Sequence, residues 1–335
     1  MQLKTKAVNN LFLFNVYHPD DASAEAYANA LLPKPTVEDL RRLEEKELFS
    51  RLKALDMPLE KEEFFQLTHM VDTPEEAATL LIDTAKIPPL YETLYLLVFE
   101  LWRRLVPERK TLSIFCDELD RQIFFYNQGS LKSDESLQKA LSTLEQILQE
   151  SADRGKGKEE IRSYFDAYLA HDIEHFLYEY ITDHIGSDAH LYAEELLDSF
   201  YFYMRDFRWF DFLYSKLIYP ENPSAANEAL RMLMQELVEH PDLDLQLEIL
   251  HFMIESCDRK SFIYLVEKTV RLIQLEEDFL ELLDLASEYY LRLDEEEVQE
   301  QIDEILVARE KRSPQRFSKD DPDVQEFLRI IQLDR

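Results

Sequence analysis

The sequence predicts an all-α protein, built as a right-handed α-solenoid of antiparallel helical hairpins with a period of about 35 residues. Only four of the 335 residues are glycine, whereas average usage would give roughly 23. The chain therefore has little material for β-hairpin turns or phosphate-binding loops. In the second half, helix-breaking residues recur at even spacing, and apolar residues lie at helical spacing between them. Hydrophobic residues make up 46% of the chain, which is enough to build a sizeable core.

For residues 1–150, the sequence predicts an irregular helical domain or a set of divergent hairpins. The expected helices cover roughly 21–32, 36–56, 60–71, 74–86, 89–105, 109–127 and 132–151. Thr36 and Thr73 each precede acidic residues, which is typical of a helix N-cap followed by side chains that suit the helix dipole. Residues 151–158 hold two of the four glycines and are the predicted linker.

For residues 159–310, the sequence predicts the array of repeated helical hairpins. The breakers Asp172, Asp206 and Pro241 lie 34 and 35 residues apart, and Pro223 and Asp258 are also 35 apart. An aspartate side chain caps a helix by accepting its free N–H groups, and a proline at the first helical position gives up no hydrogen bond. Each hairpin of such an array buries its apolar stripe against its neighbours.

For residues 311–335, the sequence predicts a basic segment followed by a C-terminal capping helix. Five basic residues fall between positions 309 and 319, and an amphipathic segment follows at 324–333. The capping role is one interpretation. The other is that the basic segment folds into an acidic groove and competes with partners.

The stretch from Phe200 to Leu217, FYFYMRDFRWFDFLYSKL, resembles the middle of a tetratricopeptide repeat. That family has an aromatic-rich first helix, a turn that contains aspartate, and a second helix. Residues 168–181 resemble the same segment one period earlier. The resemblance is degenerate, because Asp198 and Phe210 fall where the family has small residues. It covers about residues 158–310 and implies a superhelical hairpin array.

The resemblance also implies a binding groove, because in that family the first helix of each hairpin lines the concave surface. Aligned through the turn aspartate, the groove would contain Tyr192, Glu195, Ser199, Phe202 and Tyr203. Aromatic residues between positions 192 and 219 are denser than one helical face can bury, and Tyr and Trp suit interface anchors because each combines an apolar body with a polar tip. The alternative is that all of these side chains pack between hairpins.

The formal charge of −32 indicates which partners to expect. A polyanion repels phosphate backbones and anionic lipid surfaces, so the sequence predicts neither nucleic-acid nor membrane binding. We expect a non-enzymatic scaffold, adaptor or chaperone without a cofactor, whose partner is another protein or peptide that is basic or amphipathic. The acidity is also consistent with a role in solubility alone. A structural homo-oligomer is a further alternative.

One string favours a different class of function. His171-Asp-Ile-Glu174-His175 matches the H-x-x-E-H pattern of inverted zinc peptidases, in which two histidines bind zinc and the glutamate activates water. Glu248 and Glu255 are candidates for a downstream glutamate ligand. A zinc-dependent hydrolase that uses His171 and His175 is therefore the alternative to an ordinary helical surface.

Two features predict a cytoplasmic protein. Cys116 and Cys257 lie far apart, as expected of reduced thiols. No uncharged run approaches the ~18 apolar residues that a membrane-spanning helix needs. Near the amino terminus, asparagines interrupt the apolar stretch that follows Lys4 and Lys6, which disfavours a signal peptide.

Overall fold

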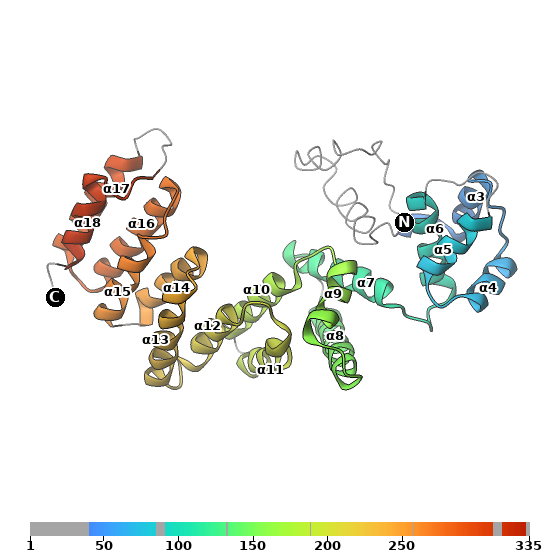
Figure 1. Ribbon diagram of the computed structural model, residues 1–335, viewed down its shortest axis with the longest axis horizontal. Helices are drawn as coiled ribbons and strands as arrows, with labels where there is room; N and C mark the ends of the chain where they lie inside the picture. Colours follow the sequence, from blue (N-terminus) through green and yellow to red (C-terminus); the bar gives the residue numbers. More distant parts are fainter. Residues whose placement is uncertain are drawn as a thin grey trace. The chain divides into compact units, whose positions relative to one another are not determined.

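The computed structural model describes residues 40–84, 91–131, 133–187, 189–256, 258–310 and 317–332. These ranges form sixteen α-helices and two short 3₁₀ helices, without a strand, so the all-α prediction is confirmed for this part of the chain (Figure 1). The helix expected at 21–32 and the N-cap expected at Thr36 lie outside the described residues. None of the described helices has the length and apolar character needed to cross a bilayer. The chain divides into two compact units, residues 1–176 and 177–335.

The described residues of the first unit begin with helices that correspond to the patterns predicted at 60–71, 74–86 and 89–105, whereas the single helix predicted at 36–56 is divided into a 3₁₀ helix and an α-helix. They are η1 (Leu40–Arg42), α3 (Glu45–Ala54), α4 (Lys61–Met70), α5 (Pro74–Thr84) and α6 (Tyr91–Leu105). The Thr73 hydroxyl accepts a hydrogen bond from the Glu76 N–H at 3.2 Å, which confirms the predicted cap of α5. Capping of this kind stabilises a helix by about 1 kcal/mol.

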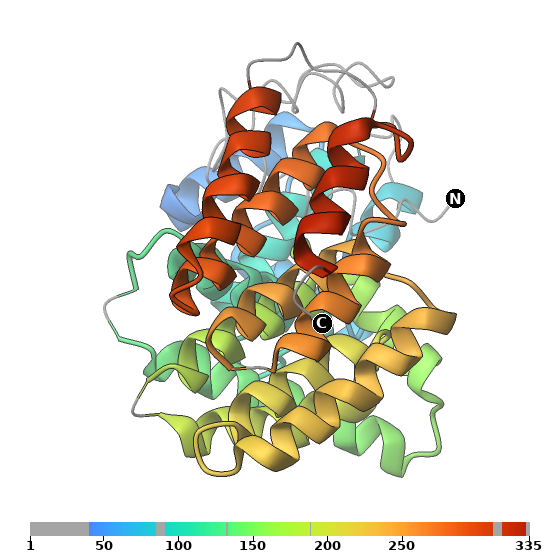
Figure 2. The same cartoon turned by 90° about the vertical axis from the view of Figure 1, so that its left-hand side faces the viewer.

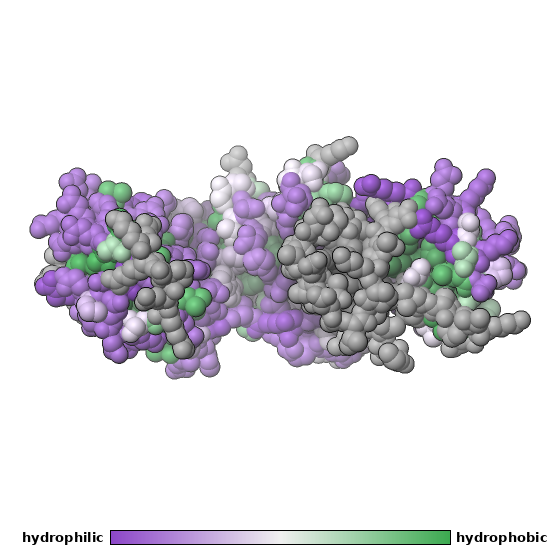
Figure 3. Space-filling model, turned by 90° about the horizontal axis from the view of Figure 1, so that it is seen from above, coloured by the Kyte–Doolittle hydropathy of each residue, from purple (hydrophilic) through white to green (hydrophobic). Residues whose placement is uncertain are grey.

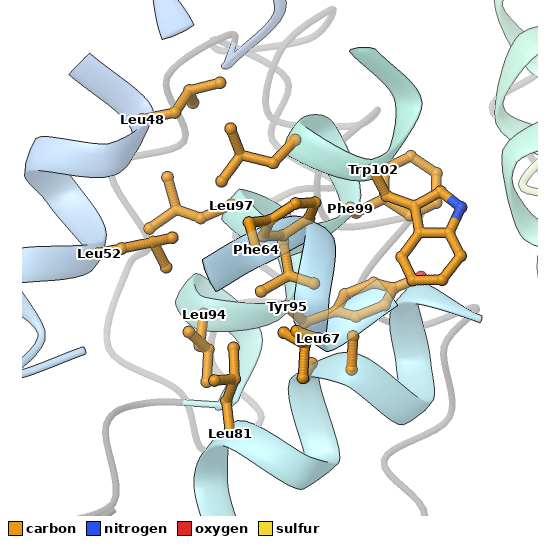
Figure 4. Close-up of a cluster of buried hydrophobic side chains, with 14 of the residues drawn as sticks. Leu48, Leu52, Phe64, Leu67, Leu81, Leu94, Tyr95, Leu97, Phe99 and Trp102 are labelled. Carbon is orange, nitrogen blue, oxygen red and sulfur yellow. The ribbon is translucent and has the colours of Figure 1, made fainter. Parts of the chain in front are cut away.

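These helices share one apolar core, which Figure 4 shows in close-up. Leu48 and Leu52 from α3, Phe64 from α4, and Leu94 and Trp102 from α6 are fully buried in it. Burying each such side chain contributes about 1.5–3 kcal/mol. Because these buried side chains come from α3, α4 and α6, the core forms only when these helices pack together.

Arginine 104 ties the start of this bundle together. Its guanidinium donates to the carbonyl oxygens of Leu40, Arg41 and Leu43 at 3.0, 3.1 and 2.7 Å. The same guanidinium donates to the buried carboxylate of Glu100 at 2.6 Å. The backbone carbonyls of Leu40, Arg41 and Leu43 thus receive charge-assisted hydrogen bonds.

Three more helices complete the part of the first unit that precedes α10. They are α7 (Leu112–Asn127), α8 (Glu135–Asp153) and α9 (Lys158–Tyr168), and α7 packs against both of the others. The predicted linker at 151–158 falls on the turn between α8 and α9, inside the first compact unit. Gly155 has a φ of +82° there, a conformation that favours glycine.

The second unit is a succession of helices of 11 to 17 residues. They are the main part of α10 (Ile173–Ile185), then α11 (His190–Phe200), η2 (Tyr201–Tyr203), α12 (Phe207–Ile218), α13 (Pro223–Glu239), α14 (Leu243–Ser256), α15 (Arg259–Thr269), α16 (Glu276–Arg292), α17 (Glu296–Glu310) and α18 (Pro322–Gln332).

The predicted breakers cap these helices. Asp206 accepts from the Arg208 N–H at 3.0 Å, at the start of α12. Asp258 accepts from the Ser261 N–H at 3.1 Å, at the start of α15. The predicted breaker Pro241 directly precedes Asp242, which caps α14 by accepting from the Leu245 N–H at 3.1 Å. The interpretation of Asp206 and Asp258 as N-terminal boundaries is confirmed.

Helices of the second unit pack against their neighbours in sequence. Close pairs are α12 with α13, α14 with α15, and α16 with α17, and contacts also join α12 with α14, α13 with α15, and α14 with α16. Figures 1 and 2 both show α16 and α17 side by side. Each apolar stripe is thus buried against helices that are near in the chain.

Polar side chains also join turns that lie one expected period apart. The Trp209 indole N–H donates to Asp242 at 3.3 Å, across 33 residues. Arg259 forms a two-point ion pair with Glu295 at 2.5 and 2.8 Å, across 36 residues. These contacts place the beginning of α12 next to that of α14, and the beginning of α15 next to that of α17.

The C-terminal helix α18 covers the end of this succession and corresponds to the amphipathic segment predicted at 324–333. It packs against α15 and α17 and buries Val324, Phe327, Ile330 and Ile331. Residues 311–316, which carry most of the predicted basic segment, lie outside the described residues.

Arginine 309 fixes α18 to α16 and α17. Its side chain pairs with Glu276 at 2.6 Å, with Asp321 at 3.1 Å and with Asp323 at 3.4 Å. The guanidinium also lies 4.8 Å from the centre of the Phe279 ring. The buried Arg309 guanidinium on α17 thus binds one carboxylate of α16 and two carboxylates at the start of α18.

Candidate functional site

Helix α11 has one buried and one exposed face. Ala193, Leu196, Leu197 and Phe200 are buried, at the spacing of a single helical stripe. On the opposite side Leu191 is 79% exposed, and Glu194, Glu195 and Asp198 are exposed as well. The sequence pattern therefore leads directly to an amphipathic helix.

The end of α11 differs from the prediction, which placed Phe202 and Tyr203 on the first helix of a hairpin. The α-helix ends at Phe200, and residues 201–203 form the 3₁₀ helix η2. The Tyr201 ring packs 5.1 Å from Phe207. Contacts with α12, together with the poor helix propensity of consecutive aromatic residues, explain the earlier end. Phe202 and Tyr203 therefore lie beyond the first helix.

The five predicted groove residues divide into exposed and half-buried ones. Glu195 is exposed and Phe202 is 59% exposed. Tyr192, Ser199 and Tyr203 are half-buried. The rings of Phe202 and Tyr203 lie 5.3 Å apart. Phe202 and Tyr203 are thus brought together, whereas Tyr192 lies at the other end of α11.

Tyr192 packs between helices. Its ring centre lies 6.3 Å from that of Tyr180 and 5.4 Å from that of His184, both on α10. Edge-to-face ring pairs of this kind add about 0.5–1.5 kcal/mol to packing. For Tyr192 the contacts favour the alternative interpretation, in which the aromatic side chain joins neighbouring helices.

A second aromatic group connects η2 with the exposed side of α12. The Tyr201 hydroxyl donates to the Asp211 carboxylate at 2.7 Å. Burial and this hydrogen bond raise the pKa of Tyr201 to about 12. Burial also raises the pKa of Asp211. Tyr214, one turn further along α12, is half exposed, so aromatic surface continues from η2 onto α12.

The carboxylates on the exposed side of α11 have no counter-ions. Glu194, Glu195 and Asp198 form no hydrogen bond or ion pair with any residue that the structure describes. We call Leu191, Glu194, Glu195, Asp198 and Phe202 together the α11 face. It combines two large exposed apolar side chains with three uncompensated negative charges.

Sequence reasoning missed a larger acidic surface on α14 and α16. The solvent-facing acids of these two adjacent helices are Asp244, Glu248, Glu255, Glu277, Glu281, Asp284 and Glu288. Within the described ranges, Glu255 alone among them has an ion pair, with Arg292 at 3.4 Å. Figure 3 shows hydrophilic residues in purple over most of the C-terminal helices at the left.

The crowding of these acids affects the pKa of Glu281. Burial, followed by the charges of Asp278, Glu248 and Asp244, raises the pKa of Glu281. The signal in the sequence was a row of acids at i, i+4, i+7 and i+11 in α16 and at i, i+4 and i+11 in α14, where His251 takes the i+7 position. Acids are so frequent in this chain that the row did not stand out.

A polar cluster lies beside this surface. Tyr178 is buried, and its ring packs 5.0 Å from that of Trp209. Burial and the nearby carboxylates of Glu248 and Glu179 raise the pKa of the Tyr178 hydroxyl. Burial lowers the pKa of Lys216, although the same two carboxylates oppose the shift. Glu248 therefore lies close to side chains from α10 and α12.

The H-x-x-E-H string does not lie on one helix. His171 precedes α10, whereas His175 is exposed in its first turn. Buried Asp120 on α7 accepts from the His171 N–H at 3.0 Å and contacts its ring Nδ1 at 2.9 Å. Asp120 also accepts from the Ala170 N–H at 2.8 Å. The string thus forms a turn held to α7, instead of the helical histidine pair of the inverted zinc peptidases.

Across the part of the chain that the structure describes, no group of three or more His, Cys, Asp or Glu side chains is placed to hold a metal ion. Glu248 and Glu255, the predicted downstream glutamates, lie on α14. No protein-family model, curated protein or solved structure matches this chain.

Proposed function

We propose that this protein is a non-enzymatic protein-interaction module whose second unit binds a basic or amphipathic segment of another protein. Surface acid without a counter-ion among the described residues is the observation that carries the proposal. Seven carboxylates face solvent on α14 and α16, of which Glu255 alone has an ion pair with a described residue, and three more carboxylates lie on the α11 face. Surface charge of one sign attracts an oppositely charged partner and fixes its register.

The proposal includes a right-handed α-solenoid of degenerate tetratricopeptide-like hairpins. Two findings support it: helices contact their first and second neighbours along the chain, and side-chain bonds join turns 33 and 36 residues apart. A solenoid presents equivalent helices side by side and so offers an extended surface for a partner segment. Scaffold, adaptor and chaperone roles all use such a surface.

The test is a binding measurement with synthetic helical peptides of about 18 residues. Fluorescence anisotropy of the full-length chain would compare a basic amphipathic peptide, an acidic amphipathic peptide and a basic peptide without apolar residues. We expect saturable binding of the first peptide, weakened as salt rises from about 0.05 to about 0.5 M because screening shortens the reach of charges. Absence of saturable binding, or equal binding of the acidic peptide, would contradict the proposal.

A further inference from the structure

We propose that the α11 face is a docking site for one amphipathic helix of a partner protein, with apolar residues at both ends of its contact stripe and lysine or arginine between them. This inference rests on the proposed function and assigns its partner and its location. The supporting features are an exposed apolar side chain at each end of the face, free carboxylates between them, and a helical spacing that a partner helix reproduces.

The exposed side of α11 has an unusual composition for a surface helix. Helix α11 packs with α12 and η2, and its Tyr192 ring also contacts α10, whereas the side that carries Leu191 is exposed. Leu191 is 79% exposed and Phe202 is 59% exposed. A single exposed apolar side chain needs no explanation. Two of them, separated by carboxylates without counter-ions, form a recognition pattern with apolar anchors and a central charge.

Charge complementarity selects the kind of partner. Glu194, Glu195 and Asp198 leave three negative charges within about one turn of helix, unpaired by any described residue. The chain as a whole carries a formal charge of −32. An acidic or neutral partner would bury these carboxylates without compensation, which costs several kcal/mol. A basic centre on the partner supplies the missing counter-ions.

The spacing along α11 favours a helical partner over an extended one. Leu191 and Asp198 are seven residues apart on α11, which corresponds to about two turns and ~10.5 Å along the axis, and Phe202 follows in the next turn, on η2. A partner helix repeats the same ~5.4 Å step per turn, so its residues i, i+4 and i+7 stay in register with the α11 part of the face, and i+11 follows towards Phe202. An extended strand presents one residue per ~6.8 Å on each side and would be out of register by about 3 Å over two steps.

The probe is a synthetic helix of about 18 residues, with leucine at positions i and i+11 and lysine at i+4 and i+7. Its affinity for the full-length protein would be measured by fluorescence anisotropy with the variants Leu191→Ala, Phe202→Ala and Glu195→Lys. Matched controls are Met232→Ala, at a 66% exposed position on α13, and Glu288→Lys on α16. All five positions are exposed, and circular dichroism would confirm that each variant keeps its helices.

Each α11 variant should weaken binding about fivefold or more, as truncation of an interface anchor does. The two controls should change it less than about twofold. A second probe, with glutamate in place of both lysines, should not bind the natural chain. It should bind the Glu195→Lys variant in part, because the charges of probe and protein are exchanged at that position.

The outcomes separate the two proposals. Saturable binding that the α11 variants leave unchanged and Glu288→Lys weakens would overturn the α11 site while preserving the proposed function, and would place the partner on α14 and α16. Binding that none of the five variants alters would also overturn the α11 site. No saturable binding of the probe to the natural chain would overturn both.

Discussion

Replacing Arg309 by methionine tests whether one buried cation holds the C-terminal helix in place. The Arg309 side chain is 2% exposed and that of its partner Glu276 is 14% exposed. Removing one member of a buried ion pair costs about 3–5 kcal/mol, because the remaining charge is left without a partner. The more exposed Asp321 and Asp323 add at most about 1 kcal/mol each. We expect a loss of about 4 kcal/mol from the free energy of unfolding of the second unit.

The assay is urea unfolding followed by tryptophan fluorescence. The chain has two tryptophans, and a Trp102→Phe background leaves Trp209 to report on the second unit. In that background, Arg309→Met should shift the transition to lower urea, by an amount that corresponds to the expected loss. The double variant Arg309→Met/Glu276→Leu should recover about half of that loss or more, because it removes the orphaned carboxylate.

A loss below about 1 kcal/mol for Arg309→Met would refute the reasoning, because that is the value of an exposed ion pair. A double variant that is less stable than Arg309→Met alone would contradict it too. Such a result would mean that Glu276 contributes through contacts other than the buried pair.

Two further predictions concern single side chains. Asp120→Ala should lower the free energy of unfolding of the first unit by about 3 kcal/mol, because it leaves a half-buried turn without the acceptor of two N–H groups. His171→Ala should cost about 1 kcal/mol, because the backbone hydrogen bonds to Asp120 remain. Chemical denaturation would measure both. In the folded chain the pKa of Tyr201 is about 12, so the Tyr201 hydroxyl binds its proton more tightly there than in the unfolded chain. The stability that this protonated hydroxyl contributes is full below about pH 10 and is lost as pH rises towards 12. Ultraviolet titration should show this alkaline step, which Tyr201→Phe should abolish and Asp211→Asn should move towards ordinary tyrosine.

The helix boundaries could be predicted because the signals that set them are local. Asp206 and Asp258 cap the helices that directly follow them, and a capping residue acts within three positions of itself. The extent of α11 could not be predicted in the same way. It is set by the contact of Tyr201 with Phe207 and Asp211 on the next helix, which no local pattern reveals.

The candidate site was predictable in part. Resemblance to a repeat family selected Glu195 and Phe202, which are exposed, and also Tyr192, whose ring joins α11 to α10. Distinguishing these cases requires knowing which side of the helix meets its neighbour. The role of His171 was beyond sequence reasoning, because its partner Asp120 lies 51 residues away in the chain.

The central claim is that the second unit receives a basic amphipathic helix on the α11 face. Photo-crosslinking tests it most directly, with a photoreactive phenylalanine analogue at position 202 and, in a separate sample, at position 232 on α13. With the leucine–lysine probe helix bound, we predict a crosslinked adduct from position 202 and none from position 232. Saturable binding of the probe with adducts from position 232, or from neither position, would contradict the claim.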